Sequence, residues 1–252
     1  MHRSGYSWAL TLLVSSSLFV ACSTNYQVVK SNRTEYPIST AVAADSTVIR
    51  KYLPYKLKMD SQMNAVLGYS DVTLTKKSSG GESLLGNFFS DAALFEARKL
   101  DPSIDFAIPS TNGGLRNDLP LGAISLANVF ELMPFENELI VFNLKGEDVK
   151  SLIDFIAKSG GQPVSGISLN IKNKKPTAIF IGGRPFDVAK NYHVATSDYI
   201  AGGGDGLNSF KTPISSKILG LKVRDALILY IKEKQAAGEK ISSKLDRRVS
   251  ND

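Results

Sequence analysis

Cysteine and histidine are scarce in this chain of 252 residues. Cysteine occurs once, at Cys22, and histidine twice, at His2 and His193. A single thiol can form neither a disulfide framework nor a thiolate metal cluster within one chain. Hydrolytic zinc and two-metal phosphoesterase sites normally use several imidazole ligands together with carboxylates. The sequence therefore predicts no cofactor, no metal site and no catalytic residues of its own.

A strong excess of charge of one sign is also missing. The 30 Lys and Arg residues exceed the 24 Asp and Glu residues by a net charge of +6, and they form only short pairs such as Lys76-Lys77 and Arg247-Arg248. Nucleic-acid-binding proteins usually cluster their cations into a patch or stripe. We therefore expect no nucleic-acid partner. The content of 43% hydrophobic and 21% charged residues is typical of a globular protein.

Apolar residues form a sustained run only near the start of the chain. This run, Trp8 to Val20, follows Arg3 and is shorter than the about 20 residues that span a bilayer. Its length and its positive flank are typical of the apolar core of an export signal. Cys22 follows directly after Ala21, an arrangement that resembles a bacterial lipobox, although Leu18 lies one place earlier than in the common pattern.

The lipobox resemblance implies that Cys22 is the lipidated first residue of the mature protein. We expect residues 1–21 to be a lipoprotein signal peptide and the protein to be a membrane-anchored, periplasm-facing lipoprotein of the bacterial cell envelope. The alternative is an ordinary signal peptide cut after Ala21. Residues 22–45 are polar and predict an anchor and flexible tether.

From residue 46 to residue 252 the pattern alternates between helical and strand-like segments. Apolar residues recur at helical spacing in residues 82–100, 147–156 and 221–231. Short β-rich runs occupy residues 104–108, 139–144, 167–171, 178–181 and 192–196. We expect a single α/β domain of the α+β type, with mixed β-sheets flanked by helices.

Three segments combine glycine or proline turns with polar and aromatic side chains. Residues 111–116 (TNGGLR) follow an apolar strand, residues 132–137 (LMPFEN) present a ring after a proline, and residues 198–206 (DYIAGGGDG) join a tyrosine to a glycine-rich bend and a carboxylate. Each segment alone is more typical of a turn or a core anchor than of a site. Their combination is more specific.

Together and in this order, the three segments resemble the C-terminal, substrate-binding domain of the 5′-nucleotidase / UDP-sugar hydrolase family. The resemblance covers residues 46 to 249 and includes residues 85–87 (LGN), 121–125 (LGAIS), 162–166 (QPVSG), 182–185 (GGRP) and 246–248 (DRR). It implies the fold of that domain and a role in nucleotide catabolism.

The resemblance also implies the roles of individual residues. Phe135 and Tyr199 fall where the family has two rings that sandwich the base, Asp205 where an acid holds the ribose hydroxyls, and Arg116 where an arginine meets the phosphate. The remaining implied substrate-binding residues are Thr111, Asn112, Gly113, Gly114, Gly203 and Gly204. Thr111 stands where the family commonly has Asn. Some members also have an arginine where this chain has residues 78–81 (SSGG).

Complete family members carry an N-terminal metallophosphoesterase domain that binds two metals, and no segment of this chain resembles it. The favoured hypothesis is therefore the nucleotide-binding half of a split 5′-nucleotidase, presenting a phosphate ester to a separately encoded metallophosphoesterase. Divalent metals would then be bound only by that partner. The alternatives are a non-catalytic nucleotide- or nucleoside-binding lipoprotein and a scaffold domain whose pocket has drifted.

Overall fold

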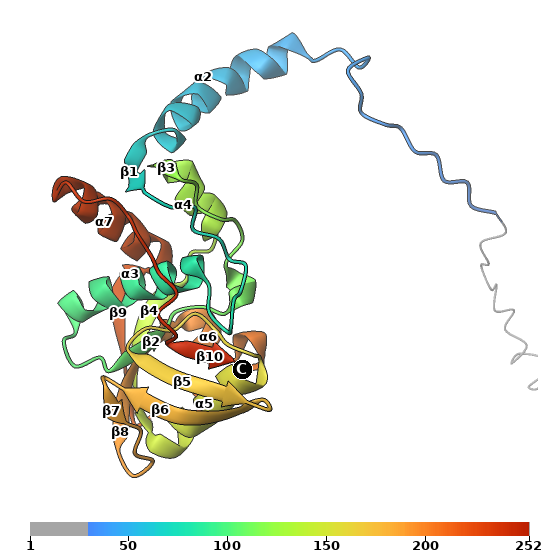
Figure 1. Cartoon of the computed structure of the whole chain (residues 1–252). Coiled ribbons are helices and arrows are strands. Elements are labelled where there is room, and N and C mark those ends of the chain that lie inside the picture. Colours follow the sequence, from blue (N-terminus) through green and yellow to red (C-terminus); the bar gives the residue numbers. More distant parts are fainter. Residues whose placement is uncertain (1–29, 252) are drawn as a thin grey trace, which may run out of the picture. The chain divides into compact units, whose positions relative to one another are not determined.

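The computed structural model describes residues 30–251 (Figure 1). Cys22 and the predicted signal peptide lie outside the described residues, so lipidation stays a prediction. Residues 30–45 contain no helix or strand and are exposed. Contacts divide the chain between Ile49 and Arg50, and every element from β1 onward belongs to the second unit. The proposed boundaries at residues 21 and 45 also stay predictions.

Helices and strands are interspersed along the described chain. The helices are α2 (Ser46–Met63), α3 (Leu84–Leu100), α4 (Leu126–Leu132), α5 (Gly146–Lys158), α6 (Asp198–Ala201) and α7 (Val223–Ala236). The strands are β1 (Val66–Ser70), β2 (Phe106–Ile108), β3 (Gly122–Ser125), β4 (Glu138–Lys145), β5 (Ile167–Lys172), β6 (Lys175–Ile181), β7 (Arg184–Pro185), β8 (Asn191–Ser197), β9 (Ser215–Lys222) and β10 (Val249–Asn251). Two 3₁₀ turns, η1 (Asn112–Gly114) and η2 (Gly204–Gly206), interrupt the loops.

The three helices expected from apolar spacing are present as α3, α5 and α7. Helix α3 begins at Leu84, two residues after the expected start at residue 82, because Ser83 caps it: the Ser83 hydroxyl accepts a hydrogen bond from the Gly86 backbone N–H at 3.0 Å. Arg98 and Lys99 occupy its last turn, where cations complement the helix dipole.

The central sheet has the strand order β2-β8-β4-β9. Strand β8 pairs in parallel with β2, with Ile108 opposite Thr196, and antiparallel with β4, with Leu139 opposite Ser197. Strand β9 pairs antiparallel with β4, with Glu138 opposite Lys222. The carboxyl ends of β2, β8 and β9 and the start of β4 therefore meet at one edge of this sheet.

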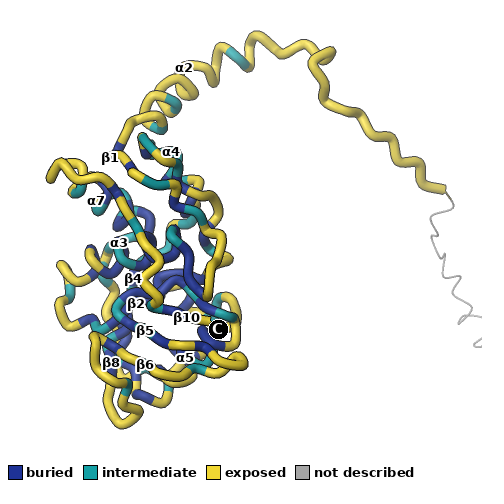
Figure 2. Tube along the Cα trace, viewed as in Figure 1, coloured by how far each residue is buried: buried dark blue, intermediate teal, exposed yellow. Residues whose placement is uncertain are grey.

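Both faces of the central sheet are buried, each against its own core. Alternate side chains of a strand point to opposite faces: Leu139 and Val141 of β4 join the core formed with α3, α4 and α7, whereas Phe142 and Leu144 join the core formed with α5 and β5. Figure 2 shows the buried residues concentrated around β2, β4 and α3. This packing on both faces supports the loops that follow the strands.

The other sheets complete the mixed architecture. One has the order β10-β5-β6-β7, with β10 parallel and β6 antiparallel to β5, and a two-stranded antiparallel sheet joins β1 to β3. These mixed sheets with flanking helices confirm the expected fold class. Helix α2 contributes no buried residue. Among the described residues, none of the helices has the length and apolar character needed to cross a membrane.

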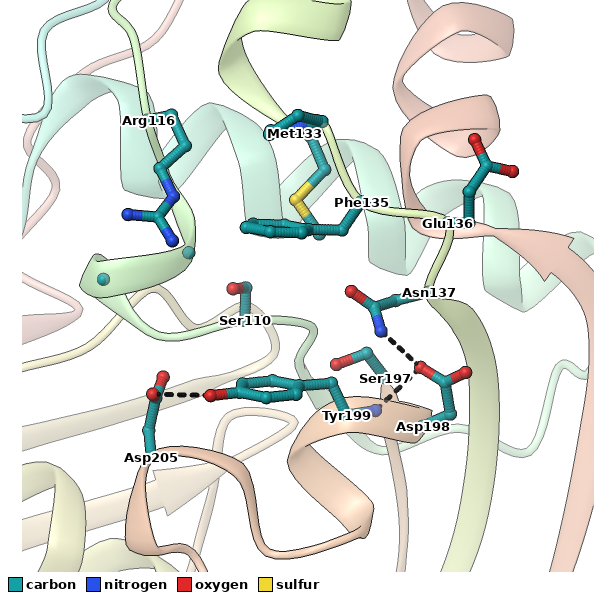
Figure 3. A pocket seen from close by; sticks show the side chains of 13 residues that line it. Ser110, Arg116, Met133, Phe135, Glu136, Asn137, Ser197, Asp198, Tyr199 and Asp205 are labelled. Carbon is teal, nitrogen blue, oxygen red and sulfur yellow. Dashed lines mark hydrogen bonds between the residues drawn. The ribbon is translucent and has the colours of Figure 1, made fainter. Parts of the chain in front are cut away.

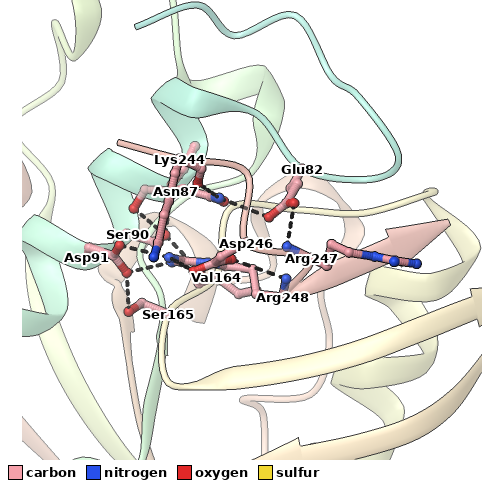
Figure 4. Close-up of polar contacts among 11 residues, drawn as sticks. Glu82, Asn87, Ser90, Asp91, Val164, Ser165, Lys244, Asp246, Arg247 and Arg248 are labelled. Carbon is pink, nitrogen blue, oxygen red and sulfur yellow. Dashed lines mark hydrogen bonds and ion pairs between the residues drawn. The ribbon is translucent and has the colours of Figure 1, made fainter. Parts of the chain in front are cut away.

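The segment before β10 is tied to α3 by a charged network (Figure 4). The Arg248 guanidinium forms a two-pronged ion pair with Asp91 and also donates to both carboxylate oxygens of Asp246, at 2.9 and 2.8 Å. The Asp91 carboxylate further accepts a hydrogen bond from Ser165 at 2.6 Å. The network thereby connects α3, the loop before β5 and the segment that leads into β10.

The Arg248 network gives the fold a pH-dependent contribution to stability. Hydrogen bonding from Arg248 is the main cause that lowers the pKa of Asp246 below its usual value of 3.8. Because this pKa is lowered in the folded state, the stabilising contribution is present above about pH 3.8 and is lost as the pH falls through the folded-state value.

Replacing Asp91 by Asn tests this network. The variant keeps the shape of the side chain but removes the charge that faces the mostly buried Arg248. Charged hydrogen bonds contribute more than neutral ones, so we expect the free energy of unfolding to fall by about 1–2 kcal/mol. Urea denaturation at neutral pH measures the change.

Asp154→Asn is the matched control. Lys150 and Asp154 form an exposed pair, with 53% and 47% of their side chains accessible, and changes at such sites are usually within about 0.5 kcal/mol. Equal losses for the two variants would show that the Arg248 network contributes no more than a surface ion pair.

Candidate functional site

A cavity of about 860 Å³ lies at the edge of the central sheet where the strand ends meet. Its walls come from three stretches of chain: the loop after β2, the turn between α4 and β4, and the loop after β8. The lining residues are Ser110, Gly113, Gly114, Arg116, Met133, Pro134, Phe135, Glu136, Asn137, Ser197, Asp198, Tyr199 and Asp205. The three segments singled out in the sequence thus meet in one cavity.

Two aromatic rings face each other across this cavity. Figure 3 shows the ring of Phe135 above that of Tyr199 with open space between them. Phe135 is partly buried and packs against the core of α3, α4 and α7. Tyr199, at the start of α6, keeps 51% of its surface accessible. The rings therefore form a slot with two apolar walls.

The wall formed by Tyr199 is held by hydrogen bonds to a carboxylate. The Tyr199 hydroxyl donates to Oδ1 of Asp205 at 3.0 Å, and the Thr111 hydroxyl donates to Oδ2 of the same residue. Asp205 thereby connects the loop after β2 to the loop after β8. Thr111 itself is buried.

The glycine-rich loop allows the Tyr199 ring to lie against the backbone. A Cβ atom on Gly204 would lie 2.5 Å from Cε1 of the ring and 2.6 Å from the Tyr199 carbonyl oxygen. Only glycine fits such a close approach. Asp205 has φ of +54°, a left-handed conformation that a short polar side chain tolerates better than most others. The loop's composition is thus explained by its geometry.

A second polar pair lies at the other end of the slot, and the sequence analysis did not identify it. The Asn137 side-chain N–H₂ donates to Oδ1 of Asp198 at 2.8 Å, and the same oxygen accepts from the Tyr199 backbone N–H at 2.7 Å. Because the amide is fixed in this way, its oxygen faces the slot (Figure 3). Asn137 lies only two residues after Phe135 in the sequence, and this closeness could have identified it as a candidate site residue. The pairing with Asp198 was not visible in the sequence.

The other predicted residues have different surroundings. Gly113 and Gly114 line the cavity. Asn112 is directed elsewhere: its side chain donates to the Gly161 carbonyl at 3.0 Å, and its backbone N–H donates to Gln162 at 2.9 Å. Gly203 and Gly204 shape the loop and are not among the lining residues.

Arg116 is the only cation among the lining residues, alongside the carboxylates of Glu136, Asp198 and Asp205. Its guanidinium lies 5.2 Å from the centre of the Phe135 ring. Its donors are available to an anionic group at the mouth of the slot. Among residues 30–251, no group of three or more His, Cys, Asp or Glu residues is placed to hold a metal ion.

Comparison with known proteins identifies the family. The family model described as "5'-nucleotidase, C-terminal domain" matches residues 66–212, and the chain belongs to this family. It is 29% identical to Protein UshA of Escherichia coli over 70% of this chain and 32% of that protein. It is 26% identical to the trifunctional nucleotide phosphoesterase protein YfkN of Bacillus subtilis over 88% of this chain and 16% of that protein.

The fold agrees with solved structures of longer proteins. The structure of the 5′-nucleotidase precursor from Thermus thermophilus matches 83% of this chain and 44% of that chain, with a TM-score of 0.69 and 24% identity. This likeness confirms the fold. The chain spans a third or less of the length of UshA and YfkN, so the activities of those whole proteins are not carried over directly.

Gly204→Ala tests the close packing beneath the Tyr199 ring. The added methyl group must displace the ring and disturb its hydrogen bond to Asp205, and such overpacking typically costs about 1–3 kcal/mol. We expect the free energy of unfolding to fall by that amount in urea denaturation, and the NMR signals of the Tyr199 ring to shift.

Gly202→Ala, in the same loop, is the matched control. A Cβ atom there would meet the Asp198 and Tyr199 carbonyl oxygens at 3.3 and 3.6 Å, which requires little movement. A Gly204→Ala protein that is as stable as Gly202→Ala and has unshifted Tyr199 signals would contradict the packing argument.

Proposed function

We propose that this chain binds a nucleotide or nucleoside in the slot between Phe135 and Tyr199. The observation that carries the proposal is the placement of two rings across an open gap, with a carboxylate at one end and a guanidinium at its mouth. Stacking a base on an aromatic side chain contributes about 1–3 kcal/mol. Two rings allow both faces of one base to be stacked.

Asp205 is proposed to accept the ribose hydroxyls. Its two oxygens already accept hydrogen bonds from Tyr199 and Thr111. An ionised carboxylate offers about four lone-pair sites, so these internal bonds leave capacity for a sugar. Arg116, with its guanidinium at the same cavity, is proposed to meet the phosphate.

Asn137 is proposed to read the edge of the base. Its amide oxygen is an acceptor whose orientation Asp198 fixes. An acceptor favours a base edge that carries an amino group, such as that of adenine, and disfavours one that carries a carbonyl oxygen at the same place. AMP is therefore the expected ligand over IMP.

The wider function proposed is that of the substrate-binding half of a split 5′-nucleotidase. The family membership and the cavity support nucleotide binding. Because no cluster of metal ligands occurs among residues 30–251, the metals are proposed to belong to a separately encoded metallophosphoesterase. That partner would supply the metals and the hydrolysis. Lipidation at Cys22 would keep this chain in the cell envelope; one relative, Lmo0130 of Listeria monocytogenes, is named a cell wall protein.

The alternative is a nucleotide- or nucleoside-binding lipoprotein without a catalytic partner. It needs the same slot and differs only in the absence of the second protein. A search for the partner therefore distinguishes these two functions, whereas binding measurements do not.

Removing either ring tests the slot. Phe135→Ala and Tyr199→Ala should each weaken AMP binding by about 5- to 150-fold, because each removes one stacking contact of about 1–3 kcal/mol. Calorimetry with AMP measures the affinity.

Asp205→Asn should weaken the binding of adenosine more than that of 2′,3′-dideoxyadenosine, since the carboxylate's proposed partners are the two hydroxyls.

Phe210→Leu provides a control for loss of aromatic packing, because Phe210 is buried in the other core. It is expected to lower stability without a specific loss of affinity. Folded Phe135→Ala and Tyr199→Ala proteins that bind AMP as tightly as the parent would refute nucleotide binding in this slot.

The proposed split between a binding chain and a metallophosphoesterase leads to a separate prediction about hydrolysis. The purified chain should not hydrolyse AMP or UDP-glucose when Mn²⁺, Co²⁺ or Zn²⁺ is added, because a two-metal centre needs several ligands at once. Purification from the native membrane should yield a metallophosphoesterase and, with it, AMP hydrolysis. Metal-dependent hydrolysis that stays with the pure chain, or the absence of any such partner, would exclude the split arrangement.

A further inference from the structure

A buried arginine lies directly behind the turn that carries Phe135. Arg224 is the second residue of α7, and only 5% of its surface is exposed. Its guanidinium stacks on the ring of Phe130 in α4, 4.0 Å from the ring centre. Burying a charge is unfavourable unless a partner of opposite charge compensates it.

The compensating charge comes from the turn itself. Arg224 donates through Nη2 to the Glu136 carboxylate and through Nη1 to the Phe135 carbonyl oxygen at 3.3 Å. Lys222, at the end of β9, also pairs with Glu136. Hydrogen bonds from Lys222 and then Arg224 lower the pKa of Glu136 to about 2, so the carboxyl is ionised at neutral pH.

The backbone adds another connection at the same place. The Val223 N–H donates to the Asn137 carbonyl oxygen at 2.9 Å. Phe135 and the two residues that follow it are therefore fixed to the junction of β9 and α7. Glu136 has 61% of its side chain accessible, although it compensates a buried charge, so its position is set by its partners and not by burial.

We propose that Arg224 is a positioning residue for the base slot: by holding the turn around Phe135 and Glu136, it sets the distance of the Phe135 ring from Tyr199. This inference rests on the proposed nucleotide binding at the same slot. It gives a positioning role to a side chain that does not itself line the cavity. Arginine suits this position because its planar fork stacks on Phe130 and donates in two directions, which lysine cannot reproduce.

The test compares Arg224→Lys with Arg98→Lys. Arg98 also donates in two directions, to the backbone carbonyls of Ile104 and Asp105, and it does not line the cavity that contains Phe135 and Tyr199. Arg224→Lys should weaken AMP binding by about 3- to 20-fold, less than Phe135→Ala, because the ring remains but is misplaced. Affinity for ribose 5-phosphate, which has no base, should change by less than about twofold. Arg98→Lys should change neither affinity.

A double-mutant cycle separates positioning from general stability. If Arg224 acts through the ring, adding Arg224→Lys to Phe135→Ala should cause no further loss of AMP affinity. Independent, additive losses, or an equal loss for ribose 5-phosphate, would overturn the positioning role. If Phe135→Ala alone leaves AMP binding unchanged, the nucleotide slot itself is refuted, which is a distinct outcome.

Glu136→Gln provides a second route if Arg224→Lys does not fold. The carboxyl is largely exposed, so the substitution keeps the shape of the turn and removes only the charge that Arg224 and Lys222 contact. It should weaken AMP binding and spare ribose 5-phosphate. Unchanged AMP affinity in a folded Glu136→Gln protein, while Phe135→Ala loses affinity, would overturn the proposal.

Discussion

The pairing of strand β8 with both β2 and β4 is the constraint on which the site depends. The register that places Ile108 opposite Thr196, and Leu139 opposite Ser197, brings two strand ends and one strand start to the same edge of the sheet. A shift by one residue would reverse which side chains face each core. Because both faces of this sheet are buried, such a shift is strongly disfavoured. The fixed register therefore also fixes the positions of the loops that carry Phe135 and Tyr199.

Much of the fold could be predicted because the buried helices have strong patterns. Helices α3 and α5 place apolar residues on one broad face, and strand β5 alternates apolar and polar residues, with Ile167, Leu169 and Ile171 buried. Strand β9 was missed because it forms an exposed edge of the sheet and lacks a sustained apolar pattern. Helix α2 was missed for a related reason, since none of its residues is buried.

The site could be predicted only in part. Glycines, a proline and aromatic residues mark the three segments in the sequence, and the family resemblance of these segments implies the roles of Phe135, Tyr199 and Asp205. Asn137 and Arg224 were not identified, because their significance depends on Asp198 and Glu136, partners that only the folded chain brings to them. The departure at Thr111 also has a structural reading: its hydroxyl contacts Asp205, while the amide oxygen facing the slot belongs to Asn137.

The C-terminal strand has a consequence for how the protein is made. Strand β10 pairs with β5, and Arg248 contacts Asp91, a residue 157 positions earlier in the chain. Contacts so distant in sequence form slowly, since long loops must close first. During synthesis, the nascent chain cannot complete this sheet until residues 249–251 have left the ribosome. Folding of the domain can therefore be completed only after this last segment has been translated.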